Sequence, residues 1–120
     1  MHEPLIKFAG TINGHSAVFL LDSEASGNFI SSNFIKANKL ATNTSKRGQS
    51  VTLADGSKQL SDQNVSQAQV TIDRFRNHVS FSVLPLSTSY DAILGMPWLR
   101  RHNPNIDWLQ RSVAVKEHEG

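Results

Sequence analysis

The stretch that decides the fold is LLDSEAS, residues 20–26, in which an aspartate ends an apolar run. The run begins at Val18, so Asp22 comes directly after four consecutive apolar residues. An ionised carboxylate at the end of a buried strand is costly unless it is paired or hydrogen-bonded, and the neighbouring hydroxyl residues can supply hydrogen bonds. A second apolar run, YDAILG at residues 90–95, stops at a glycine. These two stretches together define the candidate site.

Length and composition favour one globular domain. The chain has 120 residues, of which 38% are hydrophobic and 18% are charged, as in ordinary soluble proteins and unlike disordered ones. We expect a single domain over residues 1–120, with its core at about 5–116. There is no cysteine, which excludes disulfides, thiolate chemistry and cysteine-ligated zinc, and which fits a cytoplasmic protein.

Charge and spacing argue against several kinds of partner. The formal net charge is only +2 and the cations are scattered, whereas a nucleic-acid-binding protein concentrates positive charge on one face. No apolar run approaches the ~20 residues of a membrane span. The five histidines show no metal-ligand spacing. We therefore expect no nucleic acid, membrane, metal or cofactor.

Strand signals dominate the chain, and turn signals separate them. The pairs Asn13-Gly14 and Asp55-Gly56 are the strongest, since both residues of such a turn tolerate a positive φ. The pattern predicts four hairpins: 5–12 with 15–21, 51–54 with 57–60, 67–72 with 78–84, and 106–108 with 112–115. A further strand is expected within 90–95, and the polar segment 41–50 is interpreted as a loop.

Two short helices complete the prediction. The first covers residues 31–40, with Ser31 or Ser32 as its N-cap and with Ile35 and Leu40 facing inward. The second covers residues 96–102, with Pro97 in the first turn, where a missing N–H costs little. Trp98 and Trp108 are interpreted as core or interface aromatics.

In this order, the motifs resemble those of retropepsin-like aspartic proteases, specifically the protease domains of gypsy-type LTR retrotransposons. The segment 20–26 resembles the Asp-Ser/Thr-Gly-Ala loop of that family, and Ile93-Leu94-Gly95 resembles its later Ile-Leu-Gly loop. The most specific part is YDAILGMPWLRRHNP, residues 90–104, followed by the sequence IDW at 106–108. The resemblance covers roughly Phe8 to Val115.

The resemblance implies an all-β fold, a small closed acid-protease barrel with one or two short helices, which forms half of a twofold symmetric dimer. Asp22 would be the catalytic residue of each subunit, and the Ser23 hydroxyl would bond across the dimer axis. The other positions that match are the active-site loop residues Ala25 and Ser26, the flap residues Ala54, Asp55 and Gly56, and the structural residues Ile93, Leu94 and Gly95. The partners implied are a second copy of the chain and a polypeptide substrate.

The chemistry implied is hydrolysis of peptide bonds in a retroelement polyprotein, in the cytoplasm or within a retroelement particle. Two carboxyls about 3 Å apart cannot both ionise, so they share one proton. One then acts as general base on a water molecule, while the other protonates the peptide oxygen. A serine nucleophile is disfavoured, because no glycine-flanked elbow surrounds Ser23 or Ser26.

Glu24 departs from the family pattern, because the family has glycine at this position. A glutamate adds a side chain in the substrate channel, excludes glycine-only backbone angles, and by symmetry adds two negative charges near the dyad. Two hypotheses follow: an active aspartic endopeptidase, or a catalytically impaired dimer that serves as a peptide-binding or assembly module. A third, a ubiquitin-pathway protease-like domain of the same fold, is disfavoured by residues 95–108.

Overall fold

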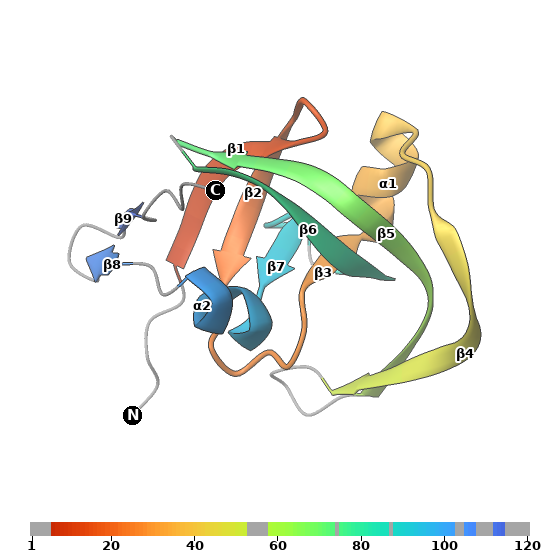
Figure 1. Cartoon of the computed structure of the whole chain (residues 1–120). Helices are drawn as coiled ribbons and strands as arrows, with labels where there is room; N and C mark the ends of the chain where they lie inside the picture. Colours follow the sequence, from red (N-terminus) through yellow and green to blue (C-terminus); the bar gives the residue numbers. More distant parts are fainter. Residues whose placement is uncertain are drawn as a thin grey trace.

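The computed structural model describes residues 6–52, 58–73, 75–86, 88–102, 105–107 and 112–114. Strands predominate among these residues, and two short helices interrupt them (Figure 1). In chain order the elements are β1 (Ile6–Ile12), β2 (His15–Leu21), β3 (Phe29–Ser31), α1 (Ser32–Asn38), β4 (Asn43–Thr52), β5 (Lys58–Ile72), β6 (Phe75–Leu84), β7 (Ala92–Leu94), α2 (Met96–His102), β8 (Asn105–Asp107) and β9 (Ser112–Ala114).

Seven strands form one sheet, in the order β1-β2-β7-β3-β6-β5-β4. Because β1 also pairs with β5, the strands from β1 to β5 in this order close into a six-stranded barrel, and β4 extends beyond it. The strands β8 and β9 form a separate two-stranded sheet, seen beside the barrel in Figure 1. The expectation of a small closed β-barrel with two short helices is confirmed.

The barrel closes where Gly10 lets β1 approach β5. The closing pairs are Thr11 with Thr71 and Ile12 with Val70. A Cβ at Gly10 would overlap the Thr71 carbonyl oxygen and would lie 2.9 Å from Cε2 of Phe19. A residue without Cβ is therefore needed for the two strands to meet.

The first hairpin forms as its turn signal predicts. Ile12 pairs with His15, and the two residues between them have positive φ, 50° at Asn13 and 84° at Gly14. Positive φ at both central residues matches the right-handed twist of the flanking strands. The turn thereby fixes the register that carries β2 to its end at Leu21.

Both predicted helices are present. The α1 helix is capped by Ser31, whose Oγ accepts a hydrogen bond from the Asn33 backbone N–H at 3.2 Å. Its most buried residue is Phe34, while Ile35 and Leu40 are half-buried and pack against the core. Neither α1 nor α2, and no other helix in the described part of the chain, is long and apolar enough to cross a membrane.

The prediction of a loop at residues 41–50 is wrong, because β4 starts at Asn43. The segment is polar, but pairing with the long strand β5 supplies its backbone hydrogen bonds, as in the pair Asn43 with Asn64. The third hairpin is longer than expected, because β6 begins at Phe75, which pairs with Ile72. The short strand β3 was also not predicted.

Two further hairpin predictions lie partly outside the described residues. The register of β4 and β5 pairs Thr52 with Lys58, on either side of the predicted turn, but residues 53–57 are not among those described. The closing hairpin is confirmed, since Ile106 pairs with Val113. Trp108 lies outside the described residues.

Buried side chains form two clusters on opposite faces of the central strands. Alternate residues of β2, among them Phe19 and Leu21, point into the barrel, while Leu20 points to the other face. There it joins a smaller cluster with Ala25, Phe29, Leu84, Leu86 and Ile93. Burial on both faces explains why β7 and the end of β2, residues 19–21, are continuously apolar.

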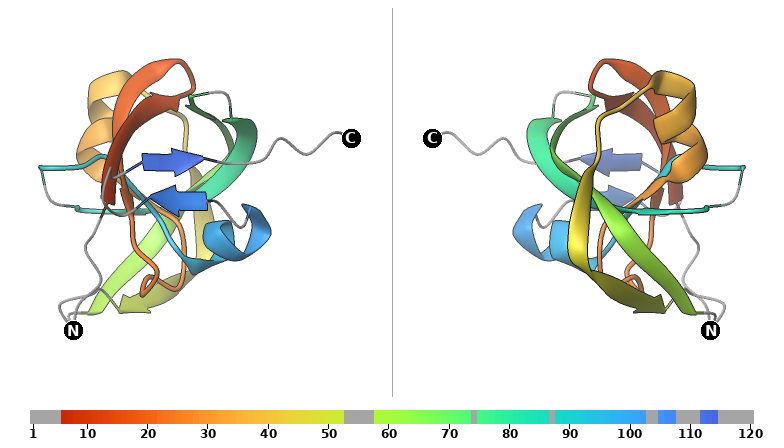
Figure 2. Two further views of the ribbon diagram at one scale, coloured as in Figure 1. Left: turned by 90° about the vertical axis from the view of Figure 1, so that its left-hand side faces the viewer. Right: turned by 90° about the vertical axis from the view of Figure 1, so that its right-hand side faces the viewer.

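The barrel has two distinct ends. In Figures 1 and 2, α1 lies at one end, and the loop that follows β2 lies at the other. The end of β4 at Thr52 and the start of β5 at Lys58 lie toward the same end as that loop. The β-ribbon that precedes and follows residues 53–57 is therefore directed toward the end of the molecule that carries Asp22.

Candidate active site

Asp22 lies directly after β2 and is buried, with only 5% of its surface exposed. Its backbone N–H donates to the carbonyl oxygen of Leu94 at 3.1 Å, which continues the parallel pairing of Leu21 with Leu94. The residue is therefore fixed to the barrel at its own backbone. Its position is set by the last step of the β2–β7 ladder.

The residues after Asp22 form a tight turn that folds back onto its carboxylate. The Glu24 backbone N–H donates to Oδ1 of Asp22 at 3.0 Å, and the Ala25 backbone N–H donates to the Asp22 carbonyl oxygen at 3.2 Å. A hydrogen bond from a backbone N–H satisfies one carboxylate oxygen that would otherwise be buried at a cost.

Glu24 fits this turn without backbone strain. Its φ is not positive, so the turn does not require a glycine-only conformation at this position. Its side chain is exposed, whereas that of the next residue, Ala25, is buried. The sequence raised three difficulties at Glu24, and one of them, a backbone conformation reserved for glycine, does not arise. The added side-chain volume and negative charge in the loop of Asp22 remain.

The junction of β7 and α2 holds the loop at three points. Besides Leu94, which binds the Asp22 backbone, the Gly95 N–H donates to Oδ1 of Asn28 at 3.0 Å, and the Met96 N–H donates to the Ala25 carbonyl oxygen at 2.8 Å. Three consecutive residues thus fix the start, the middle and the end of the loop.

Gly95 allows this close approach because it has no Cβ. A Cβ there would overlap the Gly27 carbonyl oxygen and would lie 2.7 Å from the Ala25 carbonyl oxygen. The glycine is buried. The Cβ of any other residue would push the loop away from the β7–α2 junction.

Two supporting residues were not singled out from the sequence. Asn28 holds Gly95 through its side chain, and its carbonyl oxygen accepts from the Ser82 N–H at 2.9 Å. Asp91 exchanges two hydrogen bonds with Val18: the Val18 N–H donates to Oδ2 of Asp91 at 2.7 Å, and the Asp91 N–H donates to the Val18 carbonyl oxygen at 2.8 Å.

The only signal for Asp91 was its position just before the apolar triplet 92–94. Its carbonyl oxygen also accepts from the Ser31 N–H at 2.8 Å, so one residue connects β2, β3 and β7. Asn28 carried no signal, because its partner Gly95 lies 67 positions further along the chain.

The structure thus brings the two predicted stretches together. Residues 22–26 form one loop, and Leu94 and Gly95 bind or contact it, while Ile93 packs with Ala25 in the smaller apolar cluster. The predicted flap residues Ala54, Asp55 and Gly56 lie outside the described residues. In the part of the chain that is described, no group of three or more His, Asp or Glu side chains could hold a metal ion.

Comparison with known families agrees with this geometry. Residues 18–119 match the model of the PEG10/RTL1 protease domain, which covers most of the chain. The chain belongs to the PEG10/RTL1 protease-domain family. The resemblance to gypsy-type retropepsin-like domains is thereby confirmed, and the loop with Asp22 and the Ile93-Leu94-Gly95 stretch both lie within the matched residues.

Solved structures support the fold of this PEG10/RTL1-type domain. The retroviral protease-like domain of Ddi1 from Leishmania major superposes with a TM-score of 0.73 at 18% identity, covering 95% of this chain and 90% of that one. A retropepsin-like aspartic protease from Rickettsia conorii gives a TM-score of 0.59 at 18% identity, covering 89% and 80% of the respective chains. At these identities the likeness concerns the retropepsin-like fold.

Proposed function

We propose that this domain is an aspartic endopeptidase that acts as a homodimer, with one Asp22 from each copy in a shared site. The observation that carries the proposal is the Asp22 carboxylate itself, 5% exposed at the end of a strand, with the Glu24 N–H bonded to Oδ1. A carboxyl group held in a defined orientation can act as a general acid or base. The family match supports the same reading.

In the proposed reaction, two Asp22 carboxyls about 3 Å apart hold one proton between them. The ionised carboxyl removes a proton from a water molecule as the water oxygen bonds to the scissile carbonyl carbon. The protonated carboxyl donates its proton to the carbonyl oxygen, which gives a neutral tetrahedral diol. The C–N bond then breaks as the protonated carboxyl donates its proton to the leaving nitrogen and one diol hydroxyl gives its proton to the ionised carboxyl, so the products are a carboxylic acid and an amine, and the dyad again holds one proton.

The test is cleavage of a mixed peptide library by the native protein at pH values from 4 to 8. We expect cleavage with a maximum in mild acid, because the shared proton must be retained for the general acid to act. Asp22→Asn should reduce kcat/KM by at least about a thousandfold. Cleavage that survives Asp22→Asn would refute the proposal.

A specific observation favours a second candidate, a protease-like dimer that binds peptides with little or no cleavage. Glu24, whose backbone N–H binds the candidate catalytic carboxylate, is exposed. In a symmetric dimer it would add two negative charges and the volume of two side chains near the peptide. Both effects would weaken catalysis, because misplacement of about 1 Å can cost a hundredfold in rate.

Two substitutions separate bulk from charge. Glu24→Gly removes both, and Glu24→Gln removes only the charge. A gain in kcat/KM for both variants identifies charge as the obstacle, and a gain for Glu24→Gly alone identifies bulk. If neither variant differs from the native protein and the native protein cleaves, Glu24 is a neutral substitution in an active enzyme.

Dimerisation is tested separately by sedimentation equilibrium over a range of protein concentrations. The proposal requires a dimer, since one chain presents one Asp22-type loop among its described residues. A protein that remains monomeric at every concentration while cleaving peptides would contradict the shared site.

A further inference from the structure

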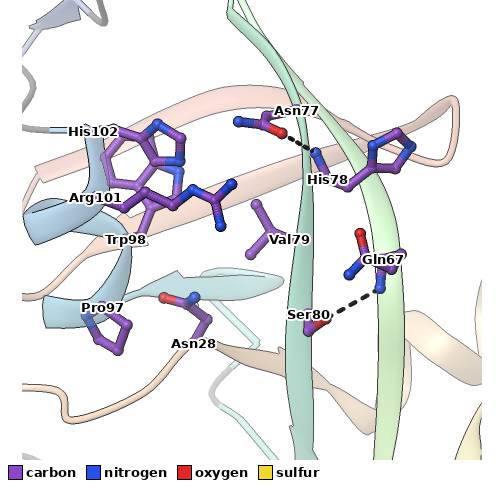
Figure 3. A pocket seen from close by; sticks show the side chains of 10 residues that line it. All are labelled: Asn28, Gln67, Asn77, His78, Val79, Ser80, Pro97, Trp98, Arg101 and His102. Atoms are coloured by element: carbon purple, nitrogen blue, oxygen red, sulfur yellow. Dashed lines mark hydrogen bonds between the residues drawn. The ribbon is translucent and has the colours of Figure 1, made fainter. Parts of the chain in front are cut away.

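A pocket of about 390 Å³ lies between α2 and the β5–β6 ribbon, apart from the acidic loop residues 22–26 (Figure 3). Pro97, Trp98 and Arg101 of α2 line one side, and residues of β5 and β6 line the other. Asn28, from the segment that precedes β3, lies between these two sides. The volume is in the range of ligand-binding pockets.

Three polar side chains that line the pocket already use their oxygen as a hydrogen-bond acceptor. Oδ1 of Asn28 accepts from the Gly95 N–H at 3.0 Å, Oδ1 of Asn77 accepts from the His78 N–H at 2.7 Å, and Oγ of Ser80 accepts from the Gln67 N–H at 3.2 Å. Each of these side chains therefore directs its acceptor toward the protein backbone. What each can still offer to a ligand is a donor, the amide NH₂ of the two asparagines and the hydroxyl of Ser80.

The charge of the pocket, like its free hydrogen-bond donors, favours an anionic ligand. Figure 3 shows the guanidinium of Arg101 extended from α2 into the pocket, and the amide nitrogen of Asn77 directed toward the same space. Arg101 is permanently cationic and offers a planar set of N–H donors. None of the residues lining the pocket is an Asp or a Glu.

We propose that this pocket is a binding site for an oxyanion, a carboxylate or phosphate group, held by Arg101 with Asn28 and Asn77. Donor groups on Asn28 and Asn77, whose own oxygens bind backbone N–H groups, together with one fixed positive charge, favour an anion over a cation. Arginine pairs with both kinds of oxyanion through two parallel hydrogen bonds. The site does not depend on the proposed peptidase activity, because none of the residues that would bind the anion belongs to residues 22–26.

An occupant of the pocket would contact the same asparagine that supports the acidic loop. Asn28 would use its NH₂ group for the anion, while its Oδ1 holds the Gly95 N–H. A bound anion would restrict the Asn28 side chain and so strengthen its hold on Gly95. We expect anion binding to slow hydrogen exchange of the Gly95 amide.

The experiment is an NMR titration of ¹⁵N-labelled protein with sodium phosphate and, separately, with sodium acetate, each against sodium chloride at matched ionic strength. We expect saturable shifts of the Asn28 and Asn77 side-chain amides with one or both oxyanions and not with chloride. The two arms show whether the site prefers phosphate or carboxylate.

The neighbouring arginines of α2 provide a matched pair of variants. Arg101→Gln should weaken binding at least about tenfold, because it removes the charge-assisted hydrogen bonds. Arg100→Gln removes an equal charge from an exposed residue that does not line the pocket and should leave affinity nearly unchanged. Shifts that do not saturate, that match those with chloride, or that weaken equally in the two variants would overturn the proposal.

Discussion

The backbone of Gly95 lies directly against the carbonyl oxygen of Gly27, so close that a Cβ at position 95 would overlap that oxygen. This contact joins the start of α2 to the loop that carries Asp22. It is made between two short segments that are far apart in sequence. The loop is held by this close contact and by hydrogen bonds from the β7–α2 junction.

Gly95→Ala should lower the free energy of unfolding by about 3 kcal/mol, at the upper end of the usual cost of overpacking, because the obstructing atoms are two backbone carbonyl oxygens. Urea denaturation measures this. Ser26→Ala, at an exposed position of the same loop, serves as the control and should stay within about 0.5 kcal/mol of the native protein. A Gly95→Ala loss below about 1 kcal/mol would mean that the loop can move away freely.

Asn28→Ala should leave the enclosed Gly95 N–H without its acceptor and destabilise the protein by about 1–3 kcal/mol. Hydrogen exchange of the Gly95 amide should become faster by at least tenfold. Asn28→Asp retains an oxygen acceptor at the same position and is the matched control. Equal exchange rates in the alanine and aspartate variants would show that this hydrogen bond does not hold the loop.

Asp91→Ala should remove the side-chain acceptor of the Val18 N–H, which lies 2.7 Å from Oδ2. We expect a loss of about 1–2 kcal/mol and faster exchange of the Val18 amide, since β2 loses one of its contacts to the segment before β7. Asp91→Asn can still accept through its amide oxygen and should lose less. Thermal unfolding of the three proteins checks the order, and an asparagine variant no more stable than the alanine variant would refute the assignment.

Glu24→Gly should lower the free energy of unfolding and raise kcat/KM. The gain in activity is expected because the substitution removes both a charge and a side chain from the loop that carries Asp22. Because Glu24 does not have a positive φ, glycine relieves no backbone strain in the folded state. It gives the unfolded chain more conformational freedom, which should lower the free energy of unfolding by about 0.5–1 kcal/mol. Glu24→Ala keeps the Cβ and should cost less. Stability is measured by urea denaturation and activity by kcat/KM; a Glu24→Gly protein more stable than Glu24→Ala would show that the turn prefers a conformation reserved for glycine.

Elements governed by local chemistry could be predicted from the sequence. The Asn13-Gly14 turn, the Ser31 cap and the α2 helix with Pro97 in its first turn each depend on residues within a few positions of one another. The first part of β4, residues 43–50, could not, because these residues are polar and only pairing with β5 makes them extended. Residues 43–50 carry no strand signal that is visible without the partner strand.

The candidate site divides in the same way. Asp22 and its loop were recognisable because the loop and the later Ile-Leu-Gly run occur in the order typical of retropepsin-like domains, and Gly95 because that run ends there. Asn28 and Asp91 were not recognisable, since their hydrogen-bond partners are 67 and 73 positions away. An asparagine or aspartate in a loop gives no sign of which distant N–H it will bind.

The sequence by itself determined the retropepsin-like family, the first hairpin, both helices and the position of the acidic loop, because each depends on contiguous residues. The tertiary structure alone decided how the barrel closes at Gly10 and Thr71, and how the β7–α2 junction holds the loop at Asp22, Ala25 and Asn28. The physical reason is that each contact joins residues far apart in the sequence, and most of them involve backbone groups, which every residue possesses. The path of the chain therefore decides which groups meet, and local sequence does not show it.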